Sequence, residues 1–271
     1  MVFSYIYDMQ IILKDTENKV LEGVRVDGDS FVFDFDTDSE NDAVRLTETV
    51  KHLQLYGKTL YYAYEFGPEV DGQTRTRFIH DFKFNGFPHE VYSKFIIRAV
   101  DSLDREVSLD SFSTVIYPES KSSVVSDILE YIYLCAHKPM KSFRLVKSLP
   151  KDIEFDYDAF TQTRLDSGNY TDRQKEEVLA NIRSMMDSIH KLDYFSIARD
   201  SKYRYRKYLK DFYHFESAEL ENAYKHISDE KVLLVDDVTT SGSTLSLLLQ
   251  TLKCSFPREV VIFSLIGNGK L

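Results

Sequence analysis

Two adjacent carboxylates, Asp236 and Asp237, directly follow an unbroken apolar run from Val232 to Val235. Such a run is typical of a strand that is covered on both faces of a sheet. The loop that follows is rich in hydroxyl groups and consists of Thr239, Thr240, Ser241, Gly242, Ser243 and Thr244. From Leu245 onward, apolar residues recur with the spacing of one helix face. The segment therefore predicts a strand, an acidic pair, a hydroxyl-rich loop and a helix, in that order.

This arrangement is suited to holding a sugar phosphate. Because the loop ends where a helix begins, free backbone N–H groups and the positive end of the helix dipole face it. Gly242 lets the backbone curl closely around a phosphate, and the loop hydroxyls can donate to its oxygens. Carboxylates at the carboxyl end of a strand can accept hydrogen bonds from sugar hydroxyls or hold Mg²⁺ through water.

The same stretch resembles the motif with which type I phosphoribosyltransferases bind phosphoribosyl pyrophosphate (PRPP), over about thirteen consecutive positions. The resemblance implies that Asp236 and Asp237 are catalytic, hold the ribose hydroxyls and bind Mg²⁺ through water. It also implies that the residues from Thr239 to Thr244 bind the 5′-phosphate. The activity it implies is Mg²⁺-dependent transfer of the phosphoribosyl group from PRPP to a nitrogenous base, with release of pyrophosphate. Family members that act on 6-oxopurines usually carry Asp where this chain has Thr240, which argues against hypoxanthine or guanine as the acceptor.

A second strand, loop and helix precede this motif. Residues 112–117 predict a strand and residues 124–136 a helix, and the polar segment Glu119, Ser120, Lys121, Ser122 lies between them. By position, the family resemblance makes this segment the loop that grips pyrophosphate, with Lys121 adding positive charge. The alternative is that Ser122 or Ser123 only caps the helix.

Bases and aromatic residues alternate in residues 201–213, the most basic stretch of an acidic chain. Members of the ComF-like family place a basic lid segment here, so the resemblance makes Arg204, Arg206 and Lys207 candidates for contacting pyrophosphate. A nucleic-acid backbone is a second candidate ligand, and a solvated helix with aromatic anchors is the third interpretation. The segment Phe78-Ile-His-Asp-Phe-Lys-Phe-Asn-Gly86 is also similar to ComF-like proteins, although the cysteine-rich zinc module that often begins that family is missing here.

Composition limits the class of protein. The net charge is −10, which disfavours a general nucleic-acid or anionic membrane surface without excluding a local basic patch. The two cysteines are far apart in sequence, which favours reduced thiols in a cytoplasmic protein. No apolar run reaches membrane-spanning length.

The alternation of strands and helices predicts an α/β fold of the type I phosphoribosyltransferase kind, with a parallel sheet flanked by helices. Residues 1–105 are expected to form an N-terminal α+β extension and residues 106–271 the main domain, with an inserted helical or lid region at about 150–230. Further elements are expected as helices over 41–56, 88–103, 172–190 and 217–227, and as strands over 59–66, 142–149, 194–198 and 259–266. Either the extension or the insertion would supply the pocket for the base.

Two functions follow from these residues. The first is a phosphoribosyltransferase that acts on PRPP and a small-molecule base, either as a monomer or as a homodimer. The alternative is a non-catalytic regulator that binds PRPP or a nucleotide, or a ComF-like partner in DNA handling. Turnover in the presence of a base would distinguish the first from the second.

Overall fold

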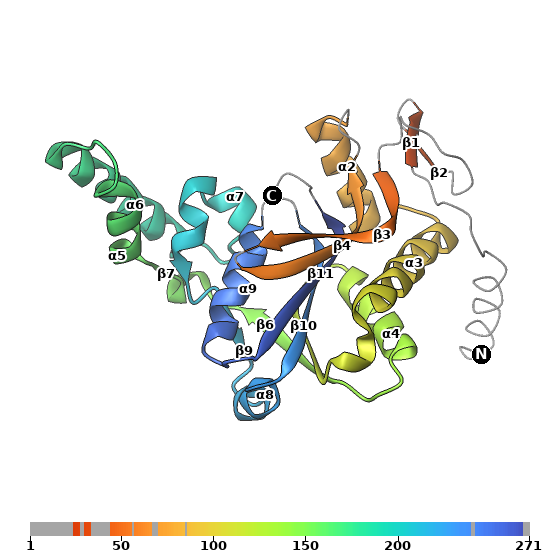
Figure 1. The fold of residues 1–271 in the computed structure, drawn as a ribbon. Coiled ribbons are helices and arrows are strands. Elements are labelled where there is room, and N and C mark those ends of the chain that lie inside the picture. Colours follow the sequence, from red (N-terminus) through yellow and green to blue (C-terminus); the bar gives the residue numbers. More distant parts are fainter. Residues whose placement is uncertain are drawn as a thin grey trace.

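The computed structural model describes residues 24–27, 30–33, 44–55, 57–66, 70–84, 86–239 and 242–267. A nine-stranded sheet runs through them in the order β2-β1-β3-β4-β11-β10-β5-β6-β9 (Figure 1). Its centre is parallel and consists of β4 (Lys58–Phe66), β11 (Glu259–Gly267), β10 (Lys231–Val238), β5 (Thr114–Pro118) and β6 (Lys141–Lys147). Helices cover both faces of the sheet, which confirms the predicted α/β class.

The sequence of β10 explains why it is central. Val232 and Leu234 belong to the core on one face of the sheet, whereas Leu233 and Val235 belong to the core on the other. All four side chains are fully buried, as expected for a parallel strand covered on both sides.

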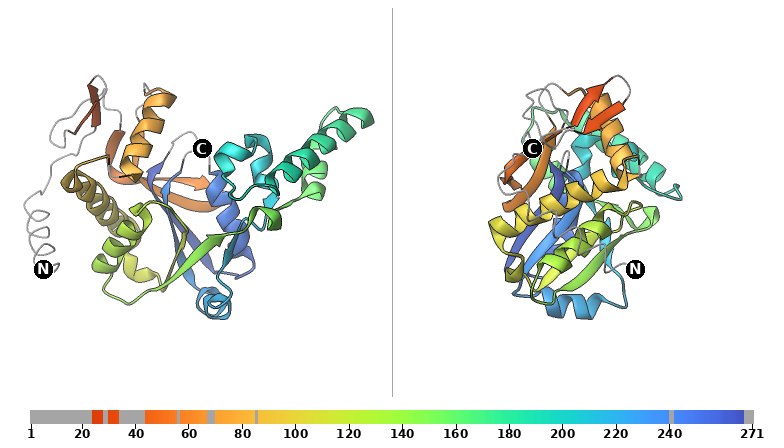
Figure 2. Two further views of the ribbon diagram at one scale, coloured as in Figure 1. Left: turned by 180° about the vertical axis from the view of Figure 1, so that it is seen from behind. Right: turned by 90° about the vertical axis from the view of Figure 1, so that its right-hand side faces the viewer.

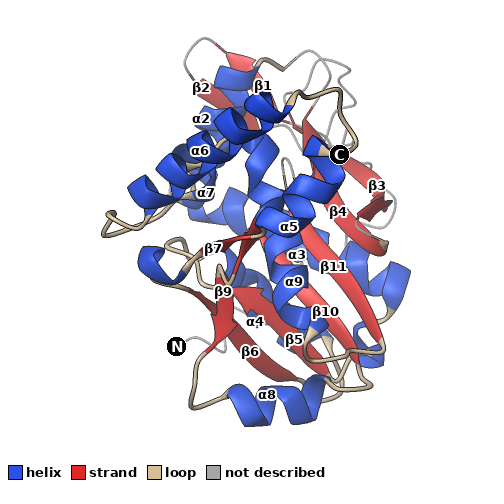
Figure 3. Ribbon diagram, turned by 90° about the vertical axis from the view of Figure 1, so that its left-hand side faces the viewer, coloured by secondary structure: helices blue, strands red, loops and turns tan. Residues whose placement is uncertain are grey.

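Different helices cover the two faces. On one side, α3 (His89–Val107) and α4 (Val124–Cys135) pack on the sheet together with an aromatic cluster that includes Phe78, Phe82 and Phe95. On the other, α9 (Ser243–Lys253) lies over the strands (Figure 3). It buries a row of leucines against them. No helix in the described part of the chain is long and apolar enough to cross a membrane.

The edges of the sheet are antiparallel. One edge is β9 (Tyr213–Phe215), which pairs with β6. The other consists of β3 (Val44–Leu55), β1 (Val24–Asp27) and β2 (Ser30–Phe33). The helix predicted over 41–56 is therefore wrong, since this segment is a strand. The alternation of apolar residues over 1–36 also predicts strands. β1 and β2 confirm this for 24–27 and 30–33, and the rest of that segment lies outside the described residues.

The insertion wraps around the β6 edge and the α9 face. Its elements are η2 (Pro150–Asp152), β7 (Glu154–Phe155), α5 (Tyr157–Phe160), η3 (Thr161–Leu165), α6 (Asp172–Ile189), α7 (Ile197–Asp200), η4 (Tyr203–Tyr208), β8 (Leu209–Lys210), β9 and α8 (Leu220–Ile227). The predicted helix over 172–190 is confirmed, and Thr171 and Gln174 form the expected capping box. The strand predicted over 194–198 is wrong, because helix α7 begins there. Figure 2 shows α5 and α6 projecting from the body as an arm.

The order of the strands determines where ligands can approach. From β5 the chain passes to β6 on one side and later returns to β10 on the other side of β5. Open α/β sheets bind ligands at the carboxyl ends of strands where the order reverses in this way. Helix α2 (Gly72–Lys83) and helix α7 stand on opposite sides of this edge (Figures 1 and 2). A short helix, η1 (Leu109–Ser111), leads into β5.

Residues before 106 contribute to the same sheet as those after it. β4 pairs in parallel with β11 from Thr59 to Glu65, and α3 packs against α4. The boundary at residue 105 stays a prediction.

Candidate functional site

The acidic pair lies at the carboxyl end of β10, next to the point where the strand order reverses. Asp236 and Asp237 are only 5% and 4% exposed. The amide of Asp237 donates to Asp236 Oδ1 at 3.0 Å, and the amide of Val238 donates to Asp237 Oδ1 at 2.7 Å. These short bonds fix both carboxylates relative to the strand.

A lysine from the N-terminal part of the chain contacts the pair. Lys83, the last residue of α2, places Nζ at 2.8 Å from Asp237 Oδ1 and 2.7 Å from Oδ2. The Lys83 side chain is 26% exposed and that of Asp237 is 6% exposed. The pair is therefore partly withdrawn from water, where an ion pair is screened less than on the surface.

Burial affects the ionisation of Asp236. Loss of solvent and the neighbouring charge of Asp237 raise the pKa of Asp236 well above its usual range, and Lys83 and Lys147 only partly oppose this. Burial also raises the pKa of Tyr213, and the nearby charge of Asp236 adds to the effect. The charges of the acidic pair therefore act on the Tyr213 side chain of β9.

A small hollow lies between the pair and the start of α9. It is lined by Asp236, Val238, Thr239, Gly242, Ser243, Thr244 and Leu245. Gly242 has φ 67°, a left-handed conformation that glycine adopts without strain and that turns the chain into the helix. Thr239 donates its amide to the carbonyl of Ile266, and its buried Oγ1 has no hydrogen-bond partner among the described residues. The predicted residues Thr240 and Ser241 lie outside the described part of the chain.

The polar loop after β5 is attached to the neighbouring strand β6. The amide of Glu119 donates to the carbonyl of Leu145 at 2.7 Å, and the amide of Lys147 donates to Glu119 Oε2 at 3.3 Å. The hydroxyls of Ser120 and Ser122 lie 3.1 Å apart. Because β5 and β10 are adjacent, this loop and the acidic pair lie at the same edge of the sheet.

Two lysines converge on one aromatic ring beside this loop. Lys121 Nζ lies 4.2 Å from the ring centroid of Tyr194, and Lys147 Nζ donates to the hydroxyl of Tyr194 at 3.1 Å. Neither ammonium has a carboxylate within ion-pair distance among the described residues. Two such cations close to one ring create a positive patch that attracts an anion.

The predicted lid residues make local contacts within η4. Arg204 lies over the ring of Tyr205, Lys207 lies over that of Tyr208, and Arg206 donates to the carbonyl of Ser201. The carbonyl of Lys207 accepts a hydrogen bond from Gln250 on α9. Their role at pyrophosphate stays a prediction.

The donor set at the acidic pair does not form a metal cage. Both oxygens of Asp237 already bond Lys83, and one of them also accepts from Val238. Among the described residues, no group of three or more His, Cys, Asp or Glu is placed to hold a metal ion. Asp237 therefore has little room for directly bound Mg²⁺, whereas Mg²⁺ held by the pair through water stays a prediction.

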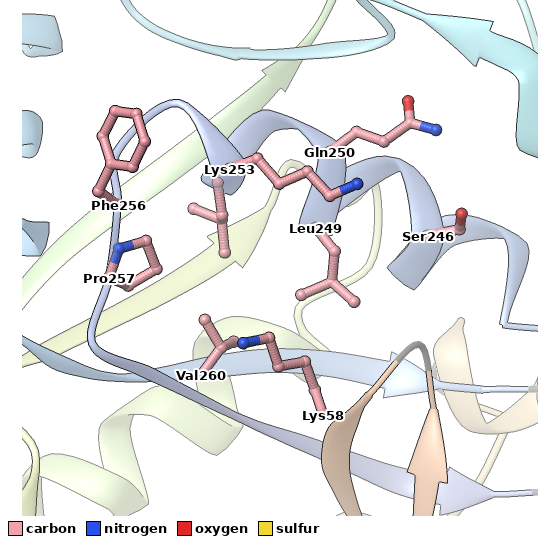
Figure 4. Close-up of a pocket in the computed structure, with 9 residues that line it drawn as sticks. Lys58, Ser246, Leu249, Gln250, Lys253, Phe256, Pro257 and Val260 are labelled. Atoms are coloured by element: carbon pink, nitrogen blue, oxygen red, sulfur yellow. The ribbon is translucent and has the colours of Figure 1, made fainter. Parts of the chain in front are cut away.

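A larger cavity lies elsewhere and shares no lining residue with the hollow. Its volume is about 320 Å³, and it runs along α9 toward the start of β11. Figure 4 shows Lys58, Lys253, Leu249 and Val260 around it, with Phe256 and Pro257 at one end. Because it holds no acidic residue and no part of the loop at 239–242, we place the site at the hollow.

Comparisons with known proteins add little to this geometry. Neither the protein-family models nor the curated proteins include a match to this sequence. Among solved structures, a hypoxanthine-guanine phosphoribosyltransferase from Bacillus anthracis, with a HEPES molecule in its active site, is similar at 12% identity and a TM-score of 0.34. The match covers 66% of this chain and 69% of that one. At this level the likeness carries no argument about substrate.

Four residues near the pair or the neighbouring β5 loop were not predicted as site residues: Lys83, Lys147, Tyr194 and Tyr213. Lys83 lies within the Phe78–Gly86 segment, whose resemblance to ComF-like proteins was the available signal. Lys147 is the last residue of β6, so its position at the carboxyl edge of the sheet could also be predicted from the sequence. Tyr194 and Tyr213 belong to the insertion, whose path across the edge no local pattern indicates.

Proposed function

We propose that this chain binds PRPP and transfers its phosphoribosyl group to a nitrogenous base, with release of pyrophosphate. The observation that carries the proposal is the hollow at the start of α9, next to two buried carboxylates. It combines the first amides of a helix, a turn at Gly242 and the Thr239 hydroxyl, which has no hydrogen-bond partner among the described residues. Amides of this kind favour a phosphate.

The proposed placement of the ligand follows the edge of the sheet. The 5′-phosphate occupies the hollow, and a ribose hydroxyl donates to Asp236. Pyrophosphate then extends toward the neighbouring β5 loop, where Lys121 and Lys147 provide positive charge beside Tyr194. Any magnesium would enter with the ligand, held by phosphate oxygens and water, and would supply further charge neutralisation of the leaving group.

In the proposed reaction, the bond between C1′ and the pyrophosphate oxygen breaks, and its electron pair leaves with pyrophosphate. The lone pair of the base nitrogen forms the new bond to C1′, and the nitrogen releases its proton to water. Positive charge develops on the ribose in the transition state, so Asp236, when ionised beside it, lowers the barrier. The lysines near pyrophosphate stabilise the leaving group in the same way.

Calorimetry with PRPP and Mg²⁺ tests the proposal. The wild type should bind in the micromolar range, and the double variant Asp236→Asn/Asp237→Asn should lose binding. Lys147→Met should weaken binding about tenfold, since one charge-assisted contact contributes about 1.5–3 kcal/mol. No heat of binding with the wild type would exclude this function.

A non-catalytic regulator is the second candidate function, and the wild-type protein can be used to test it. A screen of bases for pyrophosphate release distinguishes the two, because a regulator binds PRPP without turnover. A nucleic-acid partner receives no support from the described contacts of Arg204, Arg206 and Lys207, which are local. Cytoplasmic location and a homodimer stay predictions.

A further inference from the structure

Asp237, expected from sequence to bind Mg²⁺, already has a cation beside it. We propose that Lys83 is the resident cation of the acidic pair. Its ammonium keeps a divalent cation away from Asp237 and supplies the positive charge next to which an anionic sugar ligand binds. The role of Lys83 toward the ligand rests on the proposed function. The exclusion of a metal from Asp237 does not depend on that function.

The geometry leaves Asp237 little capacity for another cation. A carboxylate offers about four lone-pair positions. Lys83 Nζ engages both oxygens, at 2.8 and 2.7 Å, and the amide of Val238 takes a further position on Oδ1 at 2.7 Å. A metal bound directly to the remaining position would stand a few ångströms from the ammonium, where two positive charges repel strongly in a partly buried site.

The position of Lys83 in the fold makes its place stable. It is the last residue of α2, and the same helix buries Phe78 and Phe82 in the aromatic core. The ring of Phe82 contacts that of Tyr92 in a tilted arrangement, and the Tyr92 hydroxyl donates to Asp127 of α4 at 2.5 Å. The packing of α2 therefore fixes the position of the Lys83 ammonium beside Asp237.

The two carboxylates consequently differ in role. Asp237 holds Lys83, while Asp236 forms no ion pair among the described residues and borders the hollow. Asp236 is therefore the acceptor for a sugar hydroxyl. The N-terminal part of the chain completes the site by neutralising the carboxylate beside it, which a highly anionic ligand requires.

Binding of Mn²⁺, followed by electron paramagnetic resonance without any PRPP, tests the exclusion directly. The wild type should bind Mn²⁺ no better than Asp237→Asn, whereas Lys83→Met should bind at least about tenfold more tightly, a change of about 1.4 kcal/mol. Adding Asp237→Asn to Lys83→Met should remove the gain. Lys83→Arg keeps the charge and should behave as the wild type.

Lys175→Met is the matched control, because Lys175 pairs with Asp166 at 2.8 Å on the remote arm. It should leave Mn²⁺ binding unchanged. Thermal denaturation shows which variants are folded, and Lys83→Gln replaces Lys83→Met if the latter does not fold. Wild-type binding of Mn²⁺ that Asp237→Asn abolishes would overturn the inference, as would a folded Lys83→Met or Lys83→Gln with no gain.

PRPP calorimetry gives the second readout. In EDTA the wild type should keep its affinity within about threefold, while Lys83→Met should lose about tenfold and regain it with Mg²⁺. Equal affinities of the two proteins in EDTA would overturn the role toward the ligand. Failure of the wild type to bind PRPP would instead refute the proposed function, and the Mn²⁺ result would still decide the exclusion.

Discussion

The buried carboxylate of Asp236 lowers the stability of the ligand-free protein when it is ionised. It is 5% exposed and lies beside the charge of Asp237, while Lys83 bonds Asp237 instead. Burial and that like charge raise its pKa in the folded state. Between the unfolded pKa, about 4, and neutrality, the folded state binds more protons than the unfolded state. Stability therefore falls as the pH rises through this range.

Asp236→Asn should stabilise the free protein at pH 8, because the amide is neutral and its oxygen can still accept from the Asp237 amide. Each 1 kcal/mol gained corresponds to about 2–4 °C in Tm for a chain of this size. The gain should shrink toward pH 5, where the wild-type carboxyl is protonated. Thermal melts at both pH values measure it. Asp71→Asn is the control, because hydrogen bonds from Thr74 and Gln73 lower the Asp71 pKa and its loss should not raise Tm.

At the scale of elements, the turn into α9 depends on one backbone conformation. Gly242 has φ 67° and is buried beside the hollow, so any side chain there is strained. We expect Gly242→Ala to cost about 1–2 kcal/mol of stability and to weaken PRPP binding, because the loop must shift. Gly57→Ala is the matched control: its φ is 72° and an added Cβ meets nothing within 4 Å. It should cost similar stability with unchanged affinity, and equal binding by both variants would contradict the argument.

Local sequence patterns predicted the strand and the helix on either side of the acidic pair. They failed where contacts between residues far apart in the sequence determine the structure. The central strand, α9 and α6 follow from unbroken apolar runs, helical spacing and a capping box. β3 was taken for a helix because its register shifts between Leu46 and Lys51, which interrupts the two-residue alternation of a strand. The apolar residues Leu46, Val50 and Leu53 then fall at helical spacing. Lys83 was missed as a site residue because its partner is 154 positions away.

At the scale of the whole molecule, the sheet joins the two halves of the chain. β4 pairs with β11, and α3 and α4 share one core with Val261, Phe263 and Leu265 of β11. The candidate site is also built from both halves of the chain, since Lys83 comes from the first half and Asp237 from the second. Because of this arrangement we expect the N-terminal part to be required for folding.

A fragment of residues 106–271 should therefore fail to fold cooperatively. It lacks β4 and α3, so the edge of β11 and its apolar side chains would be exposed, which favours aggregation. A fragment of residues 44–271 keeps every strand from β3 to β11 and should melt in one transition. Calorimetric melts and binding of a hydrophobic dye compare both with the full chain. A sharp transition of the 106–271 fragment, with no dye binding, would show instead that residues 106–271 form an independent domain and that the N-terminal part only docks against it.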